Sequence, residues 1–197
     1  MRLFNSYYYF EGALSEDSCK TLLDLSGEKK EGLIENGKVP PSNIRKSKIS
    51  WTNDPLIYDM ITPYIYQANK DAGWNFDVDW FETAQISEYK KGHHYNWHQD
   101  CYSKPYNGEN HPNFHNKIRK LSVTVSLSHG EDYTGGDLEF GINPSPKTNK
   151  WEIFTEKRAR TKGSIIVFPS HIWHRVTPVK TGIRNSLVIW SLGYPFK

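Results

Sequence analysis

The sequence contains little cysteine and no long apolar run. Its two cysteines, Cys19 and Cys101, are far apart and neither belongs to a CxxC pair, so a disulfide framework is not predicted. No stretch approaches the roughly 18 apolar residues of a membrane-spanning helix, and the apolar run near the start is too short for a signal peptide. We therefore expect a soluble protein of a reducing compartment, the cytoplasm.

An excess of charge of one sign is also absent. The formal net charge is +3, and the Lys and Arg residues are scattered along the chain. A nucleic-acid-binding protein needs its basic residues gathered in a stripe or patch. The charge pattern therefore predicts neither a nucleic-acid partner nor a membrane partner.

Aromatic residues are abundant, with 7 Trp, 12 Tyr and 9 Phe among 197 residues, and no low-complexity tract interrupts them. A chain of this length can bury a substantial core but is short for two ordinary domains. We expect one domain over residues 1–197, with a helical N-terminal part over about 1–75 and a β-rich core over about 76–197.

Two helices are predicted in the N-terminal part. The first covers residues 16–25 behind Ser15 as N-cap, after a strand near Tyr7–Phe10. The second begins at Pro55 behind Asp54, with apolar residues recurring every three or four positions, so it should pack on a sheet. Pro63 is expected to kink this helix or to end its first half. Residues 29–46 are polar and predict an exposed excursion.

Short β-type runs dominate from residue 77 onward. They cover 81–89, 121–127, 137–140, 151–155, 164–168, 174–178 and 186–192. A series of short strands after two helices, without β–α alternation, predicts a β-sandwich or jelly roll with the helices laid against one sheet.

His98-Gln99-Asp100 places an imidazole and a carboxylate two residues apart at the end of an expected strand. Positions i and i+2 of a strand face the same side, so both side chains can approach one metal ion while Gln99 points away. Such a pair is a weak signal by itself. His174, which follows the apolar strand of residues 165–168, supplies a third ligand. Two histidines and one carboxylate leave three coordination positions open, as oxygen-activating Fe(II) enzymes require.

Arg184 lies ten residues beyond His174, at the start of the next expected strand. A cosubstrate that chelates iron through a 2-oxo and a carboxylate group has a second carboxylate that needs a partner. A guanidinium group can bind that carboxylate with two parallel charge-assisted hydrogen bonds. Arg184 is therefore a candidate cosubstrate-binding residue.

Further motifs surround these residues in a consistent order. They are Phe10–Leu23, Arg45-Lys46-Ser47, Tyr89 with Gly92 and Tyr95, Gly135–Phe140, Gly163–Ser170, His174-x-Val176-x-Pro178 and Gly182-x-Arg184. With them the chain resembles the prolyl 4-hydroxylase-like 2-oxoglutarate/Fe(II) dioxygenases over most of its length. The family register places His174, rather than His171, in the third ligand position.

The resemblance implies a double-stranded β-helix of the jelly-roll, cupin-like type. Iron would be held by His98, Asp100 and His174, and 2-oxoglutarate by Arg184 with the Tyr89 hydroxyl, with Tyr95 lining the same pocket. The implied reaction uses molecular oxygen and converts 2-oxoglutarate to succinate and CO2 while a C–H bond is hydroxylated, with ascorbate as a candidate reductant. Asp100 argues for hydroxylation, because related halogenating enzymes lack this carboxylate.

The resemblance favours a prolyl residue in a peptide or protein as the acceptor, although no residue of the sequence names it. An oxygenase acting on a free amino acid or another small metabolite is the nearest alternative, and a small closed pocket would favour it. A nucleic-acid dealkylase lacks support, because no arginine follows Arg184. A non-catalytic jelly-roll binding module, or a structural zinc site, is a further alternative, but structural zinc normally takes four ligands including cysteines.

Two further features concern the surroundings of the site. Trp97 and Trp173, each next to a proposed ligand, are expected in the core, and Trp51 and Trp190 are expected to be packing residues. The polar stretch 101–120 is long for a loop in a compact domain, and loops of this length are often functional. We expect it to be a substrate lid, with a merely disordered insertion as the alternative.

Overall fold

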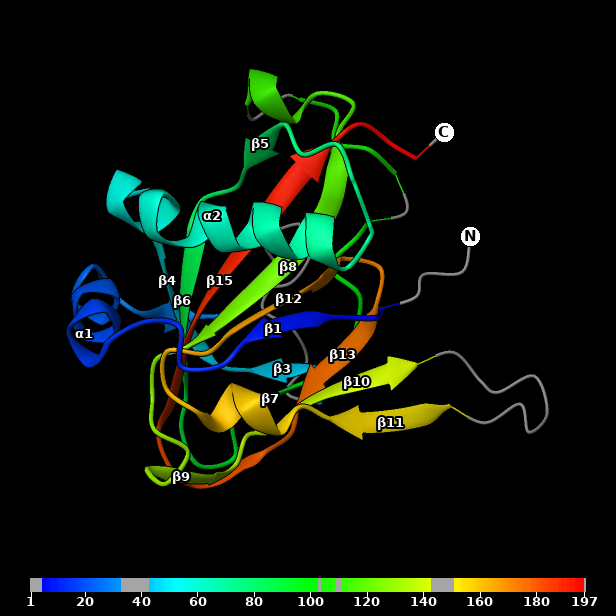
Figure 1. Ribbon diagram of the computed structural model, residues 1–197. Helices are drawn as coiled ribbons and strands as arrows, with labels where there is room; N and C mark the ends of the chain where they lie inside the picture. Colours follow the sequence, from blue (N-terminus) through cyan, green and yellow to red (C-terminus); the bar gives the residue numbers. More distant parts are fainter. Residues whose placement is uncertain (1–4, 33–42, 103, 109–110, 143–150, 197) are drawn as a thin grey trace.

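Two antiparallel β-sheets face each other in the chain, as Figure 1 shows. The computed structural model describes residues 5–32, 43–102, 104–108, 111–142 and 151–196. The larger sheet has eight strands, and in it β5 (Trp80–Phe81) pairs with β15 beside the main path. The main path runs β1 (Tyr8–Phe10), β12 (Ile165–Pro169), β8 (Ile118–Ser126), β15 (Arg184–Gly193), β6 (Ala84–Tyr89), β4 (Lys48–Thr52) and β2 (Lys30–Glu31).

The second sheet has five strands and supplies the opposite wall. Its order is β11 (Glu152–Thr155), β10 (Leu138–Ile142), β13 (Trp173–Val176), β7 (His94–His98) and β3 (Arg45–Lys46). A further pair joins β9 (Tyr133–Gly135) to β14 (Val179–Gly182), and two short 3-10 helices cover Pro112–Phe114 and Lys157–Arg160. Two facing antiparallel sheets confirm the predicted mainly β jelly roll.

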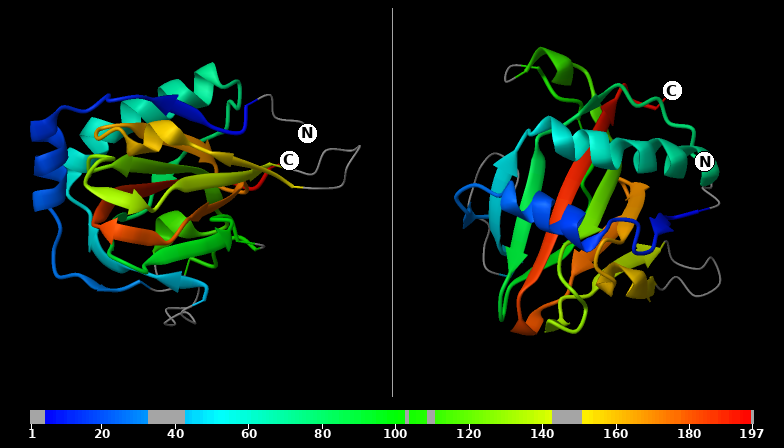
Figure 2. Two further views of the ribbon diagram at one scale, coloured as in Figure 1. Left: turned by 90° about the horizontal axis from the view of Figure 1, so that it is seen from below. Right: turned by 60° about the vertical axis from the view of Figure 1, so that its left-hand side comes forward.

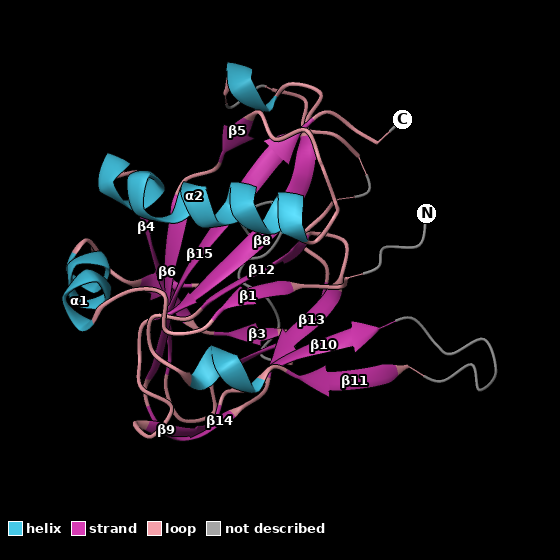
Figure 3. Ribbon diagram, in the orientation of Figure 1, coloured by secondary structure: helices cyan, strands magenta, loops and turns pink. Residues whose placement is uncertain are grey.

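Both predicted helices are present and lie on the outer face of the larger sheet (Figures 2 and 3). Helix α1 covers Glu16–Asp24, and the Ser15 hydroxyl accepts a hydrogen bond from the Ser18 N–H. Helix α2 covers Pro55–Asp71, and the Asp54 carboxylate accepts one from the Leu56 N–H. Each helix therefore begins where its capping residue predicts.

Of the two alternatives predicted for Pro63, the end of the helix is contradicted, because α2 continues through it to Asp71. A proline within a helix costs about 3 kcal/mol, since it lacks the N–H group and its ring crowds the preceding turn. Pro63 is on the exposed side, whereas Ile57, Ile61 and Ile65 are fully buried against the sheet. Burying such side chains contributes about 1.5–3 kcal/mol each, which is enough to hold the helix together.

The two faces of the larger sheet differ in character. Its outer face, with α1 and α2, forms the main hydrophobic core, which includes Ile86, Val125 and Leu187. Its inner face carries small polar side chains such as Ser122, Thr124 and Ser186, and it faces the second sheet. Alternation along each strand thus separates a core from a polar interior. No helix in the described part of the chain combines the length and apolarity needed to cross a membrane.

Residues 29–46 were predicted to form an exposed excursion, and this prediction is wrong at the two ends of the segment. Residues 33–42 lie outside the described part of the chain. Residues on either side of that gap form the short strands β2 and β3, and Arg45 is buried. The Gly32 N–H donates to the Ser47 carbonyl, which ties the two ends of the segment together. Arg45 therefore reaches the space between the sheets.

Candidate metal centre

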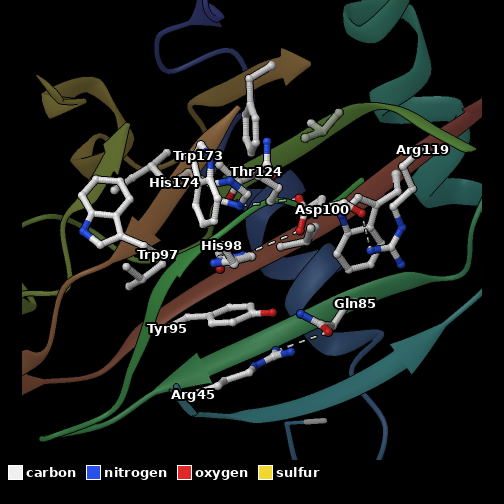
Figure 4. Close-up of a pocket in the computed structure, with 18 of the residues that line it drawn as sticks. Arg45, Gln85, Tyr95, Trp97, His98, Asp100, Arg119, Thr124, Trp173 and His174 are labelled. Atoms are coloured by element: carbon white, nitrogen blue, oxygen red, sulfur yellow. Dashed lines mark hydrogen bonds and ion pairs between the residues drawn. The ribbon is translucent and has the colours of Figure 1, made fainter. Parts of the chain in front are cut away.

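The structure brings together His98, Asp100 and His174 (Figure 4). His98 is the last residue of β7, and His174 is its Cα partner in the neighbouring strand β13. Asp100 lies just beyond the end of β7, and its N–H donates to the Ser170 carbonyl at 2.9 Å. Two paired strands and the turn after one of them therefore position all three side chains.

The donor atoms of the three side chains have the spacing of a metal site. His98 Nε2 lies 3.6 Å from Asp100 Oδ1, and His174 Nε2 lies 3.5 Å from Asp100 Oδ2. Neighbouring ligands that are each about 2.1 Å from an ion are about 3 Å apart, so these two distances are about half an ångström longer than those around a bound ion. Among the described residues this is the one group of three or more such side chains that could hold a metal ion.

Both imidazole rings are held in the orientation that metal binding requires. His98 Nδ1 lies 2.7 Å from the Asn96 carbonyl oxygen, and His174 Nδ1 lies 2.9 Å from that of Ile172. A carbonyl can only accept, so each Nδ1 carries the proton and each Nε2 presents its lone pair toward Asp100. The chemistry of this donor set fits a divalent metal ion with open coordination positions.

The protonation states of the group also favour metal binding. Burial, together with the neighbouring His174, lowers the pKa of His98 to about 3. Burial alone would raise the pKa of Asp100, but His174, His98, Arg119 and the Ser122 hydroxyl together lower it to about 2. At neutral pH both groups are therefore already deprotonated, as metal ligands must be.

Asp100 is fixed by two serines whose contact with it was not predicted. The Ser122 hydroxyl donates to Asp100 Oδ2 at 2.7 Å, and the Ser170 hydroxyl lies 2.9 Å from that of Ser122. Both serines are fully buried. A serine is too common for its spacing in the sequence to mark it, so only the fold reveals this support.

The predicted cosubstrate residues line the same cavity, which has a volume of about 700 Å³. Arg184 and Tyr89 are Cα partners in β15 and β6, and the guanidinium carbon lies 5.4 Å from the Tyr89 ring centre. Arg184 is 3% exposed and donates to the Ser186 hydroxyl at 3.2 Å. A Cβ at Gly136 would lie 3.2 Å from the Arg184 side chain, so the glycine leaves room for it. Among the described residues no carboxylate pairs with Arg184, so its charge is available to an anion.

Tyr95 stacks on the metal group itself. Its ring lies 3.5 Å from that of His98, centre to centre, at an interplanar angle of 12°. Burial raises the pKa of the Tyr95 hydroxyl above its usual value, so the hydroxyl stays protonated and can donate a hydrogen bond. His171, the rival ligand, is outside the metal group, and its carbonyl accepts a hydrogen bond from the Gln99 side chain.

An ion pair in the cavity wall was not predicted. Arg119 of β8 forms a bidentate pair with Glu82, with both N–O distances 2.6 Å, and its guanidinium carbon lies 4.0 Å from the Trp190 ring centre. Arg45 also lines the cavity, with its guanidinium carbon 4.6 Å from the Tyr95 ring centre. These arginines are far apart in the sequence, and no local pattern marked them as neighbours.

The expectation that the four tryptophans are packing residues is wrong for three of them. Trp51 and Trp173 are exposed and Trp97 is half-buried, and all three line the cavity. Figure 4 shows Trp97 and Trp173 to one side of the metal group, away from Asp100. Trp190 is buried, as expected, but also lines the cavity. Trp97 and Trp173 alternate with the inward-facing His98 and His174, so they project to the other face of the sheet and border the cavity where β7 ends and β13 begins.

The stretch 101–120 divides into a loop and the start of β8 at Ile118. Its described residues pack on one another, since Tyr106 contacts both Tyr102 and Phe114 through their rings. Tyr106 also donates to Glu82, and Tyr102 lines the cavity. This loop therefore borders the cavity; its role as a substrate lid stays a prediction.

A jelly roll with a two-histidine, one-carboxylate group beside a buried arginine defines a class of metal-binding proteins with open coordination positions. The sequence model of the 2OG-Fe(II) oxygenase superfamily matches residues 84–192, and the chain belongs to this family. A PKHD-type hydroxylase of Pseudoalteromonas atlantica is 30% identical over 111 residues, which is 54% of this chain and 41% of that protein. The chain thus spans less than half the length of the curated relatives it matches.

Solved structures share the fold. A viral collagen prolyl hydroxylase from Paramecium bursaria Chlorella virus-1 aligns with a TM-score of 0.66 at 21% identity, covering 96% of this chain and 97% of that one. A prolyl-4-hydroxylase from Pseudomonas putida aligns with a TM-score of 0.68 at 19% identity, covering 95% and 93%. The predicted double-stranded β-helix is therefore confirmed.

Proposed function

We propose that this protein is a 2-oxoglutarate- and Fe(II)-dependent dioxygenase that hydroxylates a prolyl residue of a peptide or protein and releases succinate and CO2. The observation that carries the proposal is the His98–Asp100–His174 group in one cavity with the buried Arg184. Family membership and the PKHD-type hydroxylase relatives support it. Residues from both the N-terminal part and the core build each sheet, so we also propose one domain over residues 1–197.

In this proposal His98, Asp100 and His174 hold Fe(II). When bound, iron with 2-oxoglutarate and O2 supplies the oxidising chemistry, in which one oxygen atom enters succinate and the other converts a C–H bond to C–OH. The Asn96 and Ile172 carbonyls keep the imidazole rings in place, and Ser122 keeps the carboxylate in place. Three protein ligands would leave coordination positions of the ion open for 2-oxoglutarate and O2.

Arg184 binds the distal carboxylate of 2-oxoglutarate in this proposal. Its burial strengthens the interaction, because a buried ion pair is poorly screened by solvent. The Tyr89 hydroxyl assists from the partner position on β6, and Tyr95 lines the same pocket. Ascorbate remains a candidate reductant that keeps iron in the Fe(II) state.

The acceptor is a prolyl residue of a polypeptide. Two solved structures with the same fold are named as prolyl hydroxylases, and we propose the same kind of acceptor for this chain. Trp51, Trp97 and Trp173 at the cavity mouth offer ring faces to a peptide. Exposed tryptophans line the cavity, so it is not the small closed pocket that would favour a metabolite.

The first test is an anaerobic titration of the purified protein with Fe(II) and 2-oxoglutarate, followed by visible charge-transfer absorption. We expect a band in the wild type and none in His174→Ala, with both proteins folded by circular dichroism. Succinate formation with prolyl peptides would then test the acceptor. A folded wild-type protein without a band would contradict the proposal and favour a non-catalytic binding module.

A further inference from the structure

An exposed row of apolar side chains crosses the outer face of the second sheet. It consists of Trp97, Trp173, Trp151 and Ile153, and is called the aromatic strip below. Trp173 is 37% exposed, Trp151 50% and Ile153 57%. Large apolar side chains gathered on an uncovered sheet face are uncommon in soluble proteins unless something binds them.

Strand register places these side chains in a row. Gly141 of β10 is the Cα partner of Trp173 on one side and of Ile153 on the other, and Trp97 lies on β7 beyond β13. A Cβ at Gly141 would be 3.4 Å from Trp97 and Trp173 and 3.5 Å from Trp151. Because Gly141 has no side chain, the three indole rings can approach one another above its backbone. The rings of Trp151 and Trp173 are 6.3 Å apart in an edge-to-face arrangement.

Beside the strip, Arg175 and Glu139 form an ion pair with each other. Arg175 donates to Glu139 at 2.7 Å, and its guanidinium carbon lies 4.7 Å from the Trp97 ring centre. The pair supports the indole ring of Trp97 without adding net charge to this face. The strip consequently offers ring faces and apolar edges, which suits an uncharged, apolar ligand more than an anion or a cation.

The strip is continuous with the proposed reaction cavity. Trp97 and Trp173 line that cavity, and each directly precedes a proposed metal ligand, His98 or His174. From β7 to β11 the strip crosses three strand-to-strand spacings, a length of about 14 Å. A polyproline II segment advances about 3.1 Å per residue, so about five residues would cover it.

We infer that the aromatic strip binds a proline-rich segment of the polypeptide substrate, in polyproline II conformation, on one side of the residue that enters the cavity. This inference rests on the proposed function and adds to it a second contact outside the cavity. Proline rings pack flat on indole faces, and a polyproline II segment loses little conformational freedom on binding. A free amino acid or small metabolite would leave Trp151 and Ile153 unused.

The test compares a long and a short substrate in variants outside the cavity. The long peptide has ten residues with proline on both sides of the acceptor, and the short one keeps only the acceptor and its two neighbours. Trp151→Ala and Ile153→Ser should each raise KM for the long peptide about five- to tenfold, because truncation of a tryptophan anchor commonly costs this much. KM for the short peptide and kcat for both should stay unchanged. Trp80→Ala, at an exposed tryptophan on β5, is the matched control and should change neither KM.

Direct binding separates this inference from the proposed function. A fluorescently labelled decaproline peptide should bind the metal-free wild-type protein and bind Trp151→Ala about five- to tenfold more weakly. If the variant binds the peptide more weakly but the wild type turns over no substrate, the inference about the aromatic strip would stand and the proposed function would be overturned. Unchanged long-peptide KM in both strip variants, with turnover intact, would overturn the strip. Sedimentation that shows a wild-type dimer dissociating in Trp151→Ala would also overturn it, because a second copy would then cover the strip.

Discussion

Buried Arg184 shows how a single residue can carry a functional role. Its guanidinium group is sequestered between the sheets with a serine hydroxyl and a tyrosine ring as neighbours. A buried cation with such weak partners is costly unless an anion joins it. The residue is thus better explained by a bound carboxylate than by its contribution to folding.

Arg184→Ala should weaken 2-oxoglutarate binding tens- to thousands-fold, because removing one partner of a buried charge pair costs about 2–5 kcal/mol. Arg184→Lys should fall between this variant and the wild type, since a lysine cannot form two parallel hydrogen bonds. Anaerobic titration with 2-oxoglutarate measures both. Arg158→Ala is the control, and equal affinities in the Arg184 and Arg158 variants would refute the assigned role.

His98 should make the metal-free protein sensitive to mild acid. Its folded pKa of about 3 is below the ordinary value of 6.5, so below pH 6.5 the unfolded state binds a proton that the folded state does not. Stability should therefore fall as pH decreases from 6.5 toward 3, by about 2 kcal/mol between pH 7 and pH 5.

Urea unfolding in the presence of a chelator at pH 7 and pH 5 measures this loss. His98→Gln cannot take up the proton, so its stability should change less over the same interval. The difference between the two proteins isolates His98 from other titrating groups. A wild type and a variant with the same pH dependence would show that His98 is not the cause.

At the scale of elements, an ion pair connects the cavity wall to the loop beside it. Glu82 lies between β5 and β6, Arg119 lies on β8, and Tyr106 of the loop that precedes β8 donates to the Glu82 carboxylate. The connection between β5 and β6, strand β8 and one loop thus share one carboxylate. The same arginine also donates weakly to the Asp100 carbonyl at 3.5 Å, so this connection extends to the metal group.

Glu82→Gln should destabilise the protein by about 3–5 kcal/mol, because it leaves Arg119, whose side chain is only 11% exposed, without its counter-charge. The double variant with Arg119→Met should regain part of that loss, since both charges are then absent. Urea unfolding curves provide the measurement. Glu28→Gln, in an exposed pair with Lys30, should change stability by less than about 0.5 kcal/mol. Similar losses in the Glu82 and Glu28 variants would contradict the prediction.

The elements predicted well are those with strong local signals. Ser15 and Asp54 mark the helix starts correctly, the apolar run 186–192 falls within β15, and the run 121–127 matches β8 except for Leu127, which lies one residue beyond its end. Short strands such as β3 and β9 were missed, because two or three residues show no alternation and form only when a neighbouring strand pairs with them. Helix α2 continues through Pro63 for a similar reason, because its packing on the sheet outweighs the local preference of proline.

At the scale of the whole molecule, the metal group joins separate parts of the fold. It takes residues from β7, from the turn after β7 and from β13, and Ser122 of β8 holds it from the opposite sheet. A ligand that binds only this assembled arrangement stabilises the folded state by mass action.

Mn(II) with 2-oxoglutarate, each at about 100 times its Kd, should stabilise the protein by about 2.7 kcal/mol or more and raise Tm by about 5–10 °C. Differential scanning calorimetry with and without chelator measures the change. His174→Ala should show little or none of it, because one ligand of three is missing. An equal rise in the variant would place the metal elsewhere.

Alternation, caps and motif spacing are local signals, and from them the sequence predicts a β-sandwich or jelly roll, the two helices and the candidates His98, Asp100, His174 and Arg184. Which side chains meet depends on the folded arrangement of the strands. The Glu82–Arg119 pair, the serines behind Asp100 and the row of tryptophans over Gly141 join residues that are distant in sequence. Their proximity depends on strand order and register, which no local pattern specifies.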